Sequence, residues 1–66
     1  MLWRLFRPGG GGRARAVLLP GERPTVTFFV DDVLDRAENY DAEDVALFRA
    51  DDVKRTLLAD GWKEDP

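Results

Sequence analysis

The chain has 66 residues, of which 44% are apolar and 35% are charged, and its net charge is −3. It contains no cysteine and no histidine, so disulfides, thiolate zinc sites and a histidine general base are all excluded. A chain of this length buries only about 60% of its unfolded surface, so we expect one small domain over residues 1–66.

Three strands are predicted in the first thirty residues. Residues 1–7 are rich in Leu, Trp and Phe, and they end at a proline followed by the run Gly9–Gly12. Residues 13–19 and 25–30 each alternate between two faces, and the stretch 20–24 between them has the proline and glycine typical of a turn. Short connections between consecutive strands predict an antiparallel meander.

The hydrophobic pattern changes after residue 30. Val33, Ala37 and Tyr40 recur at i, i+4 and i+7, which predicts a helix over residues 31–40 with Asp31 as its N-cap.

The following segment allows two interpretations. Residues 44–49 are interpreted as a fourth strand, because Asp51 then caps a helix over residues 51–60. The alternative is one helix from about Asp41 to Asp60. Its buried face would consist of Ala46, Ala50, Val53 and Leu57.

The last helix is predicted to end at Gly61, because glycine readily adopts the left-handed conformation that ends helices. Trp62 would then contact Leu57, and residues 63–66 would form a frayed tail. The resulting order β-β-β-α-β-α describes a small α+β domain, in which two helices cover a mostly antiparallel sheet of three or four strands.

Charge is distributed unevenly along the chain. Residues 1–30 contain five arginines and one glutamate, whereas residues 31–66 contain five bases and twelve acids. Such an asymmetry indicates either a charged partner or pairing between the two halves.

The acids after residue 30 form the main candidate site. On the predicted helix, Asp31, Asp35 and Glu38 would lie within about 60° of one another, opposite the apolar face, while Asp32 would pair with Arg36. Like charges spaced this way destabilise a helix, so we interpret the row as functional, the alternative being an ordinary solvated face. With exposed aromatic rings as apolar anchors, the predicted partner-binding residues are Asp31, Asp35, Glu38, Asp41, Glu43, Asp44, Phe29, Tyr40 and Trp62.

A row of carboxylates imitates a row of phosphates, so it fits a basic groove built for nucleic acid. The sequence therefore predicts a non-enzymatic inhibitor that blocks such a groove on a partner protein. In size and charge the chain resembles small phage-encoded inhibitors, anti-CRISPR proteins among them. It has no serine, and its few hydroxyl side chains lack the usual base, so we expect no catalysis, no cofactor and no metal.

Two alternatives remain open. The first strand is apolar on both faces, which also suits a structural accessory subunit or a homodimer. Direct nucleic-acid binding by Arg4, Arg7, Arg13 and Arg15 is the weaker alternative, because the chain is acidic overall. No apolar run approaches the roughly 18 residues that span a bilayer, so we expect a cytoplasmic protein without membrane contact.

Overall fold

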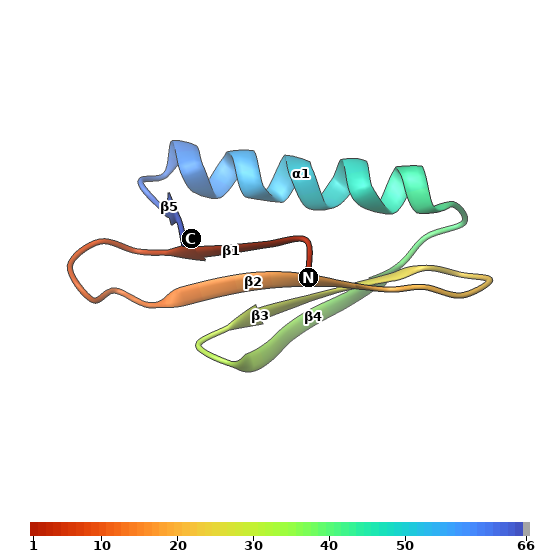
Figure 1. Ribbon diagram of the computed structural model, residues 1–66, viewed down its shortest axis with the longest axis horizontal. Coiled ribbons are helices and arrows are strands. Elements are labelled where there is room, and N and C mark those ends of the chain that lie inside the picture. The colour runs from red at the N-terminus through yellow and green to blue at the C-terminus, as the bar shows by residue number, and fades with distance from the viewer. Residues whose placement is uncertain (66) are drawn as a thin grey trace.

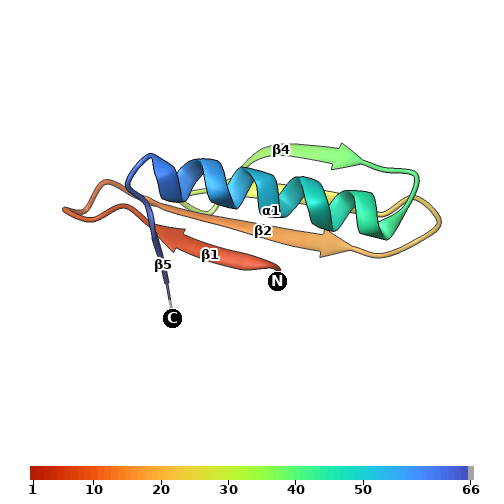
Figure 2. The ribbon, with the colours of Figure 1, turned by 90° about the horizontal axis from the view of Figure 1, so that it is seen from above.

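The computed structural model describes residues 1–65, and it contains one antiparallel sheet with a single helix along one face (Figures 1 and 2). In chain order the elements are β1 (Trp3–Phe6), β2 (Arg13–Leu19), β3 (Thr25–Val30), β4 (Val33–Asn39), α1 (Glu43–Ala59) and β5 (Lys63–Glu64). The five strands lie in the order β4-β3-β2-β1-β5. The α+β class and the meander of the first three strands are confirmed. The described residues form five strands and one helix, however, where three or four strands and two helices were expected.

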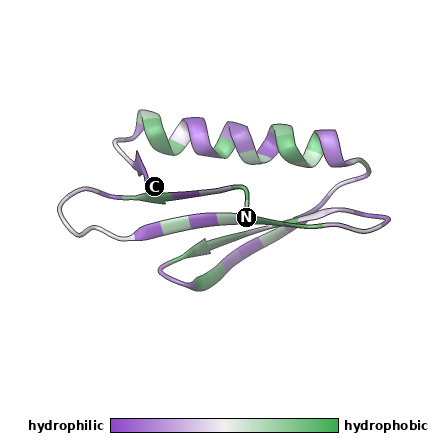
Figure 3. Ribbon diagram, viewed as in Figure 1, coloured by the Kyte–Doolittle hydropathy of each residue, from purple (hydrophilic) through white to green (hydrophobic). Residues whose placement is uncertain are grey.

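The core lies between α1 and the sheet, and it is built from alternate residues of the strands. Its buried members are Trp3, Leu5, Ala14, Ala16, Val26, Phe28, Ala46 and Ala50. The two helix alanines let α1 approach the sheet, and the indole N–H of Trp3 donates a 2.9 Å hydrogen bond to the carbonyl of Ala50. Apolar and polar bands alternate along α1 accordingly (Figure 3).

The helix predicted over residues 31–40 is wrong. Asp31 and Asp32 form a two-residue turn with φ of 51° and 65°, and β4 then runs antiparallel to β3. Positive φ at both central residues marks the type I′ turn that matches the twist of a hairpin, and Asp tolerates this conformation better than most residues. The turn places residues 33–39 beside the free edge of β3. The backbone hydrogen bonds formed there stabilise a strand more than the weak apolar periodicity of this segment stabilises a helix.

Strand β4 also contains an irregularity that local sequence does not reveal. The register with β3 shifts between Phe28 and Phe29. Phe28 pairs with Arg36 and Phe29 pairs with Leu34, so Asp35 is the extra residue of a bulge. Bulges and charged side chains both protect an edge strand against pairing with other chains. A charged residue such as Asp35 suits this edge of the sheet.

The strand predicted at residues 44–49 is also wrong, and the single-helix alternative is confirmed. Helix α1 begins at Glu43 and continues through the proposed cap Asp51 to Ala59. Ala46 and Ala50 are buried on its inner face. A continuous helix satisfies all the backbone groups that a break before Asp51 would leave unpaired.

The predicted helix end is confirmed, whereas the frayed tail is not observed. Gly61 has a φ of 102°, and the backbone N–H of Trp62 donates a 3.1 Å hydrogen bond to the carbonyl of Leu57. Residues 63–64 form β5, which pairs with β1 and lies at one edge of the sheet. An ion pair of 2.7 Å between Lys54 Nζ and a Glu64 carboxylate oxygen ties β5 to the helix. Residue 66 lies outside the described residues.

Candidate functional site

The predicted acidic row does not form, because its residues belong to a turn and a strand. Asp31 accepts a 2.9 Å hydrogen bond from the backbone N–H of Arg13. The carboxylate of Asp32 pairs with Arg15, not with Arg36 as predicted. Both acids of the turn therefore stabilise the contact between the β3–β4 hairpin and β2.

Glu38 links the edge strand to the helix. Its carboxylate accepts a hydrogen bond from the hydroxyl of Tyr40, and it lies 3.5 Å from Nε of Arg49 and 3.9 Å from a guanidinium nitrogen of Arg36. The Tyr40 hydrogen bond lowers the pKa of Glu38, and the two arginines reinforce this effect against partial burial, which raises it. Burial and the neighbouring carboxylate raise the pKa of Tyr40 in turn. This half-buried cluster serves the fold.

The other predicted acids are spread over distant parts of the surface. Asp41 pairs at 3.4 Å with Arg23 of the β2–β3 loop. Asp35 is exposed at the bulge, and Glu43 and Asp44 are exposed in the first turn of α1, where negative charge suits the helix dipole. Of the predicted acids, only Glu43 and Asp44 are neighbours within one helix or strand.

The three predicted aromatic anchors are all partly buried by contacts within the chain. The guanidinium carbon of Arg15 lies 4.3 Å from the ring centre of Phe29, and that of Arg7 lies 5.7 Å from the ring of Trp62. Tyr40 is bonded to Glu38 and packs against the core.

A different aromatic residue, Phe48, is the one that α1 carries. It is 68% exposed, and it projects from the side of α1 opposite the buried Ala46 and Ala50. On a helix its nearest neighbours are the residues three and four positions away. We call the resulting surface the outer helix face, and it comprises Asp44, Val45, Phe48, Asp51 and Asp52.

Three carboxylates thus surround one exposed ring. Asp51 pairs with Arg55 at 3.2 Å and Asp52 with Arg49 at 3.3 Å, while Asp44 accepts a hydrogen bond from the backbone N–H of Val45. Ion pairs this exposed contribute little to stability, so they leave the carboxylates available to a partner.

Phe48 is absent from the predicted site because residues 44–49 were expected to form a strand, whereas they belong to α1. In the single helix from about Asp41 to Asp60, Phe48 lies at about 180° from the Ala46/Ala50 face. That signal was present in the sequence.

Comparison with protein-family models, curated proteins and solved structures finds no match to this chain. In residues 1–65, no three acidic side chains gather closely enough to hold a metal ion. The helix of this part of the chain is neither long enough nor apolar enough to cross a bilayer.

Proposed function

We propose that the protein is a non-enzymatic binding module whose outer helix face docks into an apolar pocket with a basic rim on a partner protein. The observation that carries this proposal is Phe48, which is 68% exposed and has acids at three of its four neighbouring helix positions. A helix that presents one ring with a charged surround matches the helix-in-groove mode of recognition.

Binding energy at protein interfaces is concentrated in a few anchors, and buried aromatic rings are prominent among them. Inserting the ring of Phe48 into a pocket would remove a large apolar surface from water. The carboxylates around it favour a basic partner, speed its approach and make binding sensitive to salt.

The basic grooves of nucleic-acid-binding proteins provide a rim of the opposite charge. A phage-type inhibitor that blocks such a groove remains within the proposal, with Asp44, Asp51 and Asp52 as its acids. Asp31 and Glu38 are not included, because their carboxylates are engaged inside the domain.

Affinity capture from a lysate of the source organism tests the proposal, with wild-type protein, Phe48→Ala and Val33→Ala as parallel baits. Val33 is also 68% exposed but belongs to β4, so its variant controls for the loss of an exposed apolar side chain. We expect one protein to be retained by wild type and Val33→Ala, lost with Phe48→Ala, and released by salt.

A purified partner then allows the affinity to be measured. Phe48→Ala should weaken binding by about 2 kcal/mol, and reversing Asp44 and Asp51 to Lys should weaken it further and flatten its salt dependence. Retention of the same proteins by all three baits contradicts the proposal.

A further inference from the structure

The face of the sheet that α1 leaves uncovered is basic, although the whole chain is acidic. Residues paired on neighbouring antiparallel strands project from the same side of a sheet. In β1 the buried residues face the helix, so Arg4 and Phe6 project from the uncovered side. Their cross-strand partners are Arg15 and Arg13, and Lys63 of β5 is paired with Phe6.

Phe29 of β3 belongs to the same side, because it is the cross-strand partner of Arg15. We call this surface the open face, and its members are Arg4, Phe6, Arg13, Arg15, Phe29 and Lys63. It carries four bases, and among residues 1–65 the acids beside it include Asp31, Asp32 and Asp65. Four further acids belong to α1, on the other side of the sheet.

Two of the bases of the open face lie next to each other on neighbouring strands. Arg4 and Arg15 are directly opposite each other on β1 and β2. Like charges at directly opposed positions of a sheet destabilise it, because their Cβ atoms are only about 5 Å apart. Asp32 compensates Arg15 from the β3–β4 turn.

Both aromatic rings of the open face stand beside bases. Phe6 lies between Lys63 and Arg13 in one cross-strand row, and Phe29 lies beside Arg15 in the next. From the spacing of strands and residues, the Cα atoms of Phe6 and Phe29 are about 12 Å apart. The guanidinium of Arg15 lies over the ring of Phe29, so the two groups form one layered cation–aromatic pair.

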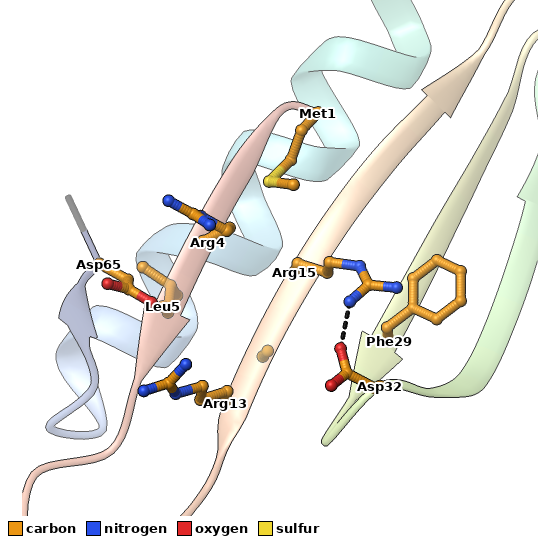
Figure 4. Close-up of a pocket in the computed structure, with 9 residues that line it drawn as sticks. Met1, Arg4, Leu5, Arg13, Arg15, Phe29, Asp32 and Asp65 are labelled. Carbon is orange, nitrogen blue, oxygen red and sulfur yellow. Dashed lines mark hydrogen bonds and ion pairs between the residues drawn. The ribbon is translucent and has the colours of Figure 1, made fainter.

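A pocket of about 140 Å³ lies at this position (Figure 4). Arg4, Arg13 and Arg15 line it together with Phe29, and the view shows Arg15 reaching from β2 toward Phe29 and Asp32. The pocket thus combines cations with an aromatic surface on a rigid sheet.

We infer that the open face binds single-stranded nucleic acid. Arg13, Lys63 and Arg15 contact phosphates, and unstacked bases lie against Phe6 and against the Phe29–Arg15 pair. Open sheets that combine aromatic rings with basic side chains bind single strands in this way, because every base has a flat face that can stack.

The shape of the surface selects a single strand over a duplex. Stacking on Phe6 and Phe29 requires bases that are not already stacked in a double helix. A five-stranded sheet is also too broad to enter a groove of duplex DNA, which admits a helix or a two-stranded ribbon.

The test is fluorescence anisotropy with a labelled oligothymidylate of about twelve nucleotides, compared with a duplex of the same length, at about 20 mM NaCl. We expect the single strand to bind more tightly than the duplex. With about three phosphate contacts, the logarithm of the affinity should fall against the logarithm of the salt concentration with a slope of about −2.

Variants on the two sides of the sheet separate this inference from general charge effects. Arg13→Ala and Lys63→Ala should each weaken binding and reduce the slope of the salt dependence by the amount that one phosphate contact contributes. Arg55→Ala on α1 should change neither the affinity nor this slope. Phe29→Leu keeps an apolar side chain but removes the aromatic face, and it should weaken binding about tenfold. Circular dichroism of each variant verifies the fold.

Phe48→Ala serves as the matched aromatic control. It removes the anchor of the proposed protein-binding site and should leave oligothymidylate binding unchanged, so each hypothesis can fail without the other. Absence of binding at about 100 μM protein and low salt overturns the inference. Equal losses for Arg13→Ala and Arg55→Ala, or equal binding of single strand and duplex, overturn it as well.

Discussion

Nε of Arg49 lies 3.5 Å from a carboxylate oxygen of Glu38, and this ion pair joins the middle of α1 to the edge strand β4. The same carboxylate accepts the hydroxyl hydrogen bond of Tyr40, so one acid connects a strand, a helix and the segment between them. Its pKa is held below the ordinary value by these partners.

Glu38→Gln should therefore destabilise the protein by about 1 kcal/mol at neutral pH. The lowered pKa of Glu38 means that its contribution is complete above the ordinary value of 4.5 and is lost as the pH falls through the folded-state pKa. Urea denaturation at pH 7 and in a series below pH 4.5 measures this. Asp35→Asn is the control, with little effect at either pH. An equal cost of Glu38→Gln across the series would contradict the assignment.

Asp31→Ala should cost about 1–2 kcal/mol. Alanine is strained at the φ of 51° found here, and the Arg13 backbone N–H loses its 2.9 Å acceptor. Asp31→Asn keeps both the conformational tolerance and the oxygen, so it should remain within about 0.5 kcal/mol of wild type. The midpoints of thermal unfolding of the two variants measure this difference in stability. If both cost the same, the negative charge matters more than the turn.

Trp3→Phe should cost about 1–2 kcal/mol, because it removes the buried hydrogen bond to the carbonyl of Ala50 together with part of the ring. Trp62→Phe, at a half-buried position, should cost less. Urea denaturation of both variants gives the comparison, and a larger loss for Trp62→Phe would show that the indole bond of Trp3 contributes little.

Ala50→Leu should destabilise the protein by about 1–3 kcal/mol, since the side chain of Ala50 is only 2% exposed between α1 and the sheet. Ala59→Leu makes the same change at an exposed position of the same helix and should be close to neutral. The midpoints of thermal unfolding provide the measurement. Equal midpoints for the two variants would mean that the helix moves outward without cost.

Strand β4 shows why sequence reasoning failed for residues 31–40. Three apolar residues at helical spacing favoured a helix, and nearly all of the strand is exposed, so no alternation indicated a sheet. The strand exists because the Asp31–Asp32 turn aligns it with β3. That pairing is a contact between segments, and no local pattern encodes it.

Helix α1 shows the reverse case, because its periodicity was readable. Ala46, Ala50, Val53 and Leu57 form the inner face that the single-helix alternative assigned to them. An acid at position 51 suits both an N-cap and a helix interior with a base at i+4, and Asp51 does pair with Arg55. The local preference of Asp51 alone did not distinguish an N-cap from a position inside a helix.

The sequence by itself determined the meander of the first three strands, the helix end at Gly61 and the absence of cysteine and histidine chemistry. These features depend on residue type and on neighbours a few positions apart. Only the tertiary structure decided that Glu38 serves the fold and that the bases of β1, β2 and β5 share one face. The physical reason is register: which side chains share a surface depends on pairing between strands that are distant in the chain.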